Sequence, residues 1–85
     1  MTITVLTPDK KLFEGTGTSV SAPGVEGRFQ ILRNHAPLVS ALGTGGVVIE
    51  RADGKRISFD IERGFAEVHR NEVNLLVQGT SNYRE

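Results

Sequence analysis

The sequence predicts an all-β protein, a small antiparallel β-sandwich of about nine to ten short strands, and three observations support this fold class. Short runs of apolar and β-branched residues recur at intervals of about 8 to 12 residues, a spacing typical of sandwiches and barrels. Gly, Pro, Asn and Asp separate these runs. No segment has the periodicity of an amphipathic helix.

The first half of the chain contains five such runs, which we expect to be separate short strands. They cover residues 2–7, 11–14, 16–22, 28–32 and 38–42. Pro8-Asp9 ends the first run, because proline has no amide to donate to a neighbouring strand. Pro23-Gly24 ends the third run and residues 34–37 end the fourth, both with residues that favour turns.

The second half contains the clearest local signal, a hairpin over residues 47–61. Its two alternating runs flank Asp53-Gly54, which readily adopts the left-handed backbone angles of a tight turn. Just before it, the glycine-rich segment 43–46 predicts a tight corner or a bulge, because positive φ angles cost glycine little. A final hairpin is expected between residues 64 and 77, with Asn71 at its turn.

A chain of 85 residues is long enough for one domain with one core. We expect residues 1–79 to form that domain and residues 80–85 to be a frayed tail. The alternation along each run predicts the following inward-facing residues: Val5, Phe13, Val20, Phe29, Ile31, Leu38, Ile49, Ile57, Phe59, Val68 and Val73.

Composition argues against several classes of function. Ten Lys plus Arg balance ten Asp plus Glu with no charged run, so no nucleic-acid partner is expected. The chain has no cysteine and only two histidines, which disfavours disulfides and zinc sites, and no cofactor is expected. No Ser, His and Asp set has the spacing of a triad, so no catalytic residue is expected.

Hydropathy gives no sign of membrane insertion. No stretch approaches the roughly 20 apolar residues that a bilayer requires, and the first residues lack the basic start and apolar run of a secretory signal. We therefore expect a soluble, intracellular protein.

One stretch carries a family resemblance. Glu26-Gly27 leads into a short apolar run, and Asn34-His35-Ala36-Pro37-Leu38 follows at a fixed distance. These residues and their spacing resemble the epsilon subunit of F-type ATP synthase, with Asn34 at a position where glycine is common. Further similar segments lie over nearly the whole chain: residues 5–8, 12–15, 46–47, 64–68 and 71–73.

The resemblance implies a non-catalytic central-stalk subunit of the rotary enzyme. Similar subunits bind the gamma subunit and the loops of the c-ring and couple proton transport to ATP synthesis. The implied location is peripheral, on the cytoplasmic face of the bacterial inner membrane, as part of F1.

The same resemblance implies the interface residues. Glu26, Gly27 and Arg28 would face the c-ring, as would the turn formed by Asn34, His35, Ala36 and Pro37. Thr7, His35 and Ser40 fall where similar subunits meet gamma. We expect both turns to lie together at one end of a stiff sandwich, forming a single docking end.

Two departures from the family pattern qualify these expectations. Gln30 and Arg33 stand where many similar subunits carry glycine and proline, so the local ring contacts are expected to differ. Similar subunits often continue into a C-terminal helical hairpin, whereas this sequence ends at Glu85. Inhibition or nucleotide sensing by such a hairpin is therefore not expected.

Two alternative functions compete with the stalk interpretation. A lipoyl- or biotinyl-type carrier domain is also a small β-sandwich, with a modified lysine at a hairpin tip, and the position of Lys55 after Asp53-Gly54 invites the comparison. However, carrier domains place that lysine in the turn between apolar or acidic neighbours, whereas Lys55 precedes Arg56 and is expected to begin a strand. A binding module for an unknown partner is the second alternative, because the fold alone does not specify a partner.

Overall fold

The computed structural model describes all residues 1–85 and contains strands but no helix. Nine strands were found, within the predicted range. They are β1 Thr2–Leu6, β2 Lys11–Gly24, β3 Gly27–Leu32, β4 Leu38–Leu42, β5 Gly45–Arg51, β6 Arg56–Ile61, β7 Arg63–His69, β8 Glu72–Gln78 and β9 Ser81–Arg84.

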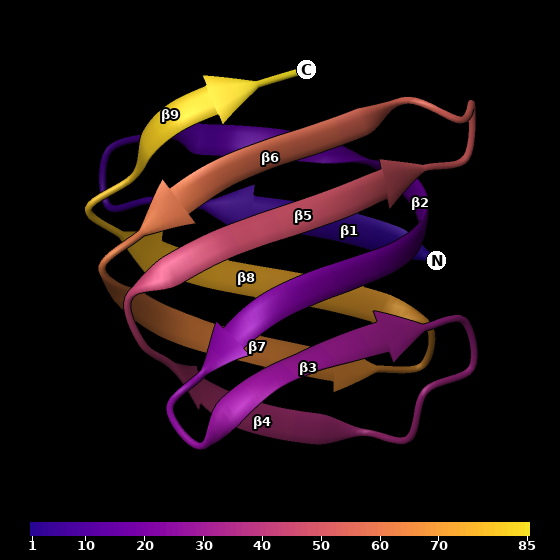
Figure 1. Ribbon diagram of the computed structural model, residues 1–85. Helices are drawn as coiled ribbons and strands as arrows, with labels where there is room; N and C mark the ends of the chain where they lie inside the picture. The colour runs from indigo at the N-terminus through magenta and orange to yellow at the C-terminus, as the bar shows by residue number, and fades with distance from the viewer.

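The strands form two layers that pack face to face (Figure 1). One layer contains β1, β8, β7 and β4 in that order, and the other contains β3, β2, β5, β6 and β9. Every neighbouring pair is antiparallel except β1 and β8, which are parallel. The predicted sandwich is confirmed, with this one parallel pair as the exception to its antiparallel pairing.

β2 belongs to both layers. Its first half pairs with β1 and its second half pairs with β3 and β5, so the strand bends around the sandwich (Figure 1). The expectation of two separate strands at 11–14 and 16–22 was therefore wrong. The register shifts between Gly17 and Ser19, and the backbone oxygen of Glu50 leaves no room for a side chain at Gly17. The shift and this small residue accommodate the bend.

Both predicted hairpins are confirmed. β5 and β6 are joined by residues 52–55, with Gly54 at φ +87°. β7 and β8 are joined by Arg70 and Asn71, whose φ angles of 49° and 65° are those of a tight two-residue turn.

The C-terminal segment differs from the expected frayed tail. Ser81–Arg84 forms β9, which pairs with β6 at the edge of its layer. The side-chain amide of Asn82 donates to the Asp60 carboxylate over 2.8 Å, and the Tyr83 ring stacks on Phe59 with ring centroids 6.1 Å apart. These contacts are made by side chains distant in sequence, which local patterns do not reveal.

The core lies between the two layers and is entirely apolar in its largest side chains. Eight of the predicted inward residues are buried: Val5, Val20, Ile31, Ile49, Ile57, Phe59, Val68 and Val73. Phe13, Phe29 and Leu38 are only half-buried and pack against the core cluster. The alternation predicted their direction correctly but not their incomplete burial.

Candidate interaction surface

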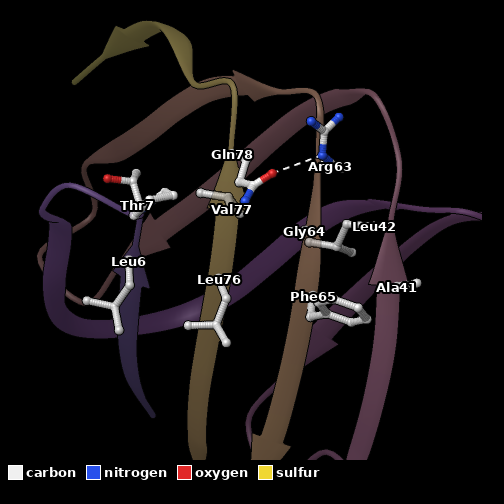
Figure 2. Close-up of a pocket in the computed structure, with 11 residues that line it drawn as sticks. Leu6, Thr7, Ala41, Leu42, Arg63, Gly64, Phe65, Leu76, Val77 and Gln78 are labelled. Carbon is white, nitrogen blue, oxygen red and sulfur yellow. Dashed lines mark hydrogen bonds between the residues drawn. The ribbon is translucent and has the colours of Figure 1, made fainter.

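An apolar row crosses the outer face of the layer formed by β1, β8, β7 and β4. Leu6 pairs with Leu76, Leu76 with Phe65, and Phe65 with Ala41, so one outward residue from each strand stands beside the next. Figure 2 shows the four side chains aligned across the strands. Leu6 is 36% exposed, Leu76 40% and Phe65 54%. We call these four residues the apolar row.

Polar groups border the apolar row on both sides. At one side, Arg63 Nε donates to Gln78 Oε1 over 2.9 Å (Figure 2). On the other side lies the next row of outward-facing residues, two positions along each strand. In three of the strands this row is polar, with Thr4, Asn74 and Glu67 paired side by side. The apolar row forms the floor of a shallow open groove of about 530 Å³. An apolar strip with a polar rim is the usual anatomy of a protein interface.

The apolar surface continues beyond the row. Val39 is 74% exposed on β4, and Val25, 64% exposed, lies in the turn between β2 and β3. The amide of Val25 donates to the carbonyl of Ala41 over 3.1 Å, which brings that turn to the end of the row. Of the seven exposed large apolar residues, only Leu32 and Tyr83 lie outside this surface, so the exposed apolar residues are concentrated on one part of the molecule.

Thr7, a predicted gamma contact, lies at the edge of this groove (Figure 2). Its hydroxyl donates to the Lys10 carbonyl over 3.1 Å and accepts from the amides of Asp9 and Lys10. The hydroxyl is therefore occupied in holding the turn between β1 and β2. What Thr7 contributes to the groove is its position rather than a free polar group.

The segment Glu26-Gly27-Arg28 forms the tight connection between β2 and β3. Gly24 pairs with Gly27, which leaves Val25 and Glu26 as the two-residue turn. Gly27 has φ +131°, a conformation that side chains rarely adopt. Arg28 donates two hydrogen bonds back to the sandwich, whereas Glu26 takes part in none of the chain's three ion pairs.

The turn Asn34-His35-Ala36-Pro37 lies at the other end of β3. Asn34 has φ +64°, as expected of a residue at a position where glycine is common, and its amide donates to Asn71 Oδ1 over 3.4 Å. His35 Nδ1 lies 2.7 Å from the Ala36 carbonyl, so that nitrogen carries the proton if the two are bonded. The backbone of Asn34 and the ring of His35 are therefore both engaged within this end of the sandwich.

The expectation of a single docking end was wrong. The turns around Glu26 and His35 are separated by β3, whose six residues span about 20 Å, and Figure 1 shows them at opposite ends of the sandwich. A strand that directly joins two turns must place them apart. The turn at Glu26 lies instead at the same end as the β1–β2 turn that contains Thr7 (Figure 1).

Ser40, the third expected gamma contact, is on the inner side of β4. It pairs with the buried Ala66, while its neighbours Val39 and Ala41 face outward. Ser40 is half-buried and its hydroxyl has only a 3.4 Å contact with the Ala41 carbonyl. The structure thus brings Thr7 to the groove but does not place Ser40 on the same face.

The sequence did not single out the apolar row, although one signal was available. In β8, Leu75 and Leu76 are adjacent, and successive side chains of a strand point to opposite faces. One of the two therefore had to face outward. Leu6 is likewise adjacent to the buried Val5, and Phe65 to the buried Ala66, so these two apolar side chains also had to face outward.

No group of three or more His, Asp or Glu residues lies close enough together to hold a metal ion. At Tyr83, partial burial and then the Glu85 carboxylate raise the pKa of the phenol, while Arg51 lowers it. No helix of the structure is long and apolar enough to cross a bilayer.

Comparison with known proteins gives consistent matches. Residues 1–82 match the family described as ATP synthase, Delta/Epsilon chain, beta-sandwich domain. The ATP synthase epsilon chain of Chlorobium limicola is 47% identical over 77 residues, which cover 91% of this chain and 88% of that protein. That of Chlorobaculum tepidum is 42% identical over 80 residues, covering 94% and 91%. The Salinibacter ruber epsilon chain is 37% identical, and the match covers 92% of this chain but 58% of that longer protein.

Solved structures match in fold. A chain of the Euglena gracilis mitochondrial ATP synthase, resolved as OSCP, F1 and c-ring, superposes with a TM-score of 0.86 at 22% identity, over 93% of this chain and 51% of that one. A chain of the Tetrahymena thermophila central stalk and c-ring gives 0.78 at 22% identity, over 96% and 66%. Because the family match covers nearly every residue, the chain belongs to the family of ATP synthase delta/epsilon chain β-sandwich domains.

Proposed function

We propose that this chain is a non-catalytic central-stalk subunit of F-type ATP synthase, which binds gamma and the c-ring and helps couple proton transport to ATP synthesis. The names of its relatives, all ATP synthase epsilon chains, support this assignment. The proposed location is peripheral, on the cytoplasmic face of the bacterial inner membrane.

The carrier-domain alternative loses its support, since the family match is to a different sandwich family. Lys55 is the last residue of the hairpin loop and not, as expected, the first residue of β6.

The gamma subunit is proposed to bind the outer face of β1, β8, β7 and β4. The observation that carries this proposal is the apolar row, which leaves Phe65 more than half exposed in the middle of a four-strand surface. Burial of apolar area contributes about 25 cal/mol per Å², so covering these side chains would add to affinity. Thr7 lies at the edge of this face.

The c-ring loops are proposed to contact the end of the sandwich that carries the Glu26 turn. This turn exposes Val25 and leaves the Glu26 carboxylate without a partner in the chain. The Asn34–Pro37 turn, at the opposite end, is proposed to contact gamma through His35 rather than the ring. A close-packed sandwich between the two contacts would transmit load with little deformation.

The direct test is assembly with gamma. Purified gamma and this chain, mixed at moderate salt, should form a stable one-to-one complex by size-exclusion chromatography with light scattering. Binding should persist at higher salt, because an apolar contact is not screened as surface ion pairs are. If gamma and the chain elute separately under all these conditions, the stalk assignment is wrong.

A further inference from the structure

Arg28 connects three strands of one layer. It stands near the start of β3, its Nη1 donates to the Gly46 carbonyl of β5 over 2.8 Å, and its Nη2 donates to Ser21 Oγ of β2 over 2.9 Å. A planar guanidinium can make two such bonds at a fixed angle, which a lysine cannot. The side chain therefore reaches from β3 across β2 to β5.

The glycine-rich corner provides the place where this guanidinium binds. Gly45 has φ +155°, and a side chain there would lie 2.8 Å from Pro23 Cβ and 3.9 Å from Arg28 Nη1. Pro23 is the residue that pairs with Arg28. Glycine at position 45 therefore allows the close approach of Pro23, and the Gly46 carbonyl beside it accepts the bond from Arg28.

The turn between β2 and β3 is consequently held from two sides. On the β4 side, the amide of Val25 donates to the Ala41 carbonyl over 3.1 Å, and the amide of Gly43 donates to the Pro23 carbonyl over 2.8 Å. On the β5 side, the two bonds of Arg28 hold the base of the turn. The tip then presents only two free side chains, those of Val25 and Glu26.

We propose that Arg28 is a positioning residue, which fixes the β2–β3 turn, and that Val25 and Glu26 make the contact with the c-ring loop. This proposal rests on the proposed stalk function and revises the role of Arg28, which the sequence suggested as a ring contact. The guanidinium is directed toward Ser21 and Gly46, and two of its five N–H donors form bonds within the chain, one from each terminal nitrogen. Val25, which the sequence did not single out, becomes part of the interface.

The test uses the chain in complex with gamma, with binding to detergent-solubilised c-ring as the readout. Ser21→Ala removes one acceptor of Arg28 without changing the tip, and Arg28→Lys keeps the charge but loses the two-pronged geometry. Since one hydrogen bond contributes about 0.5–1.5 kcal/mol, we expect ring binding to weaken about 2- to 10-fold for Ser21→Ala and about 10-fold for Arg28→Lys. Glu26→Gln should also weaken binding about 10-fold, whereas Ser58→Ala, on the same outer face but away from Arg28, should leave it unchanged.

A second readout separates positioning from direct contact. In the chain without the ring, amide exchange of Val25 and Gly27 should quicken in Ser21→Ala and Arg28→Lys and stay unchanged in Glu26→Gln. Wild-type ring binding by both Ser21→Ala and Arg28→Lys, with unchanged exchange at the turn, would overturn the proposal. Failure of the stalk function can be distinguished from failure of this proposal. If the stalk function is wrong, the wild-type chain will bind neither gamma nor the c-ring, while the exchange measurement will still report on the role of Arg28 at the turn.

Discussion

Each outer face of the sandwich carries a register row that crosses four strands, but the two rows differ in their side chains. Across β1, β8, β7 and β4, one register row consists of Leu6, Leu76, Phe65 and Ala41. Across β3, β2, β5 and β6, the corresponding row consists of Gln30, Ser21, Val48 and Ser58. Both rows stand over an equally buried interior. The difference lies only in outward positions, where folding imposes little constraint on residue type.

This comparison indicates where partner binding is encoded. An interior row such as Val20, Ile49 and Ile57 is required by the fold, because it fills the space between the layers. Exposed leucine and phenylalanine gain nothing from the fold while they remain in water. Five of the seven exposed large apolar residues lie on or beside this face, and only Leu32 and Tyr83 are exposed on the other layer. This concentration is best explained by a partner that covers the face.

The largest expected effect concerns the interior, where the two layers should behave alike. Ile49→Ala in one layer and Leu75→Ala in the other each leave a cavity at a fully buried position and should each lower the free energy of unfolding by about 2–5 kcal/mol. Urea denaturation measures both. If the free energy of unfolding of either variant equals that of wild type within experimental error, the layer that carries the substitution is not packed as described.

The next effect should separate the outer faces. Phe65→Glu places a carboxylate in the middle of the apolar row and should lower the affinity for gamma by at least about 100-fold, because apolar burial is lost and a charge is desolvated. Val48→Glu makes the same kind of change in the opposite face and should leave the affinity unchanged. Isothermal titration calorimetry on both variants compares the faces directly. Equal losses from the two substitutions would contradict the assignment of gamma to one face.

A milder change sharpens the same comparison. Leu76→Ala shortens a partly exposed side chain and should weaken gamma binding about 5-fold, equivalent to roughly 1 kcal/mol of lost apolar burial. Stability should change by less than about 0.5 kcal/mol, because Leu76 faces outward. Val48→Ala serves as the control with no expected effect on binding. An unfolding midpoint that falls strongly for Leu76→Ala would instead identify Leu76 as a core residue.

The smallest effect concerns Tyr83 at the edge of the other layer. Burial raises the pKa of its phenol above the ordinary value of about 10, so the folded state holds the proton more tightly than the unfolded state. This contribution is fully present below pH about 10 and is lost as the pH rises through the folded-state pKa. The stability of wild type should therefore fall relative to Tyr83→Phe above pH 10. A stability difference between the two proteins that is constant from pH 8 to 11, measured by urea denaturation, would argue against a partly buried phenol.

The fold was largely predictable from sequence because much of it is local. The Asp53-Gly54 hairpin and the Asn71 turn follow from residues that are adjacent in the chain. The bend of β2 and the pairing of β9 with β6 were missed, because they depend on Gly17 meeting Glu50 and on Asn82 meeting Asp60. Such contacts join segments more than twenty residues apart, which no local pattern specifies.

The candidate site was predicted less well than the fold. Family resemblance indicated Thr7, Glu26 and His35, but it grouped two turns that the strand predicted over residues 28–32, observed as β3, holds at opposite ends. The same resemblance gave Arg28 a contact role without its bonds to Ser21 and Gly46. The apolar row was not recognised as a unit because its four members come from four strands and meet only through pairing register, although the adjacent Leu75 and Leu76 were a partial signal.

The outer face of β1, β8, β7 and β4 is best tested by nuclear magnetic resonance of the isotope-labelled chain titrated with unlabelled gamma. The account predicts that the signals of Leu6, Leu76, Phe65 and Ala41 shift or broaden, while those of Ser21, Val48 and Ser58 stay in place. Perturbation of the second set with an unchanged first set would contradict it.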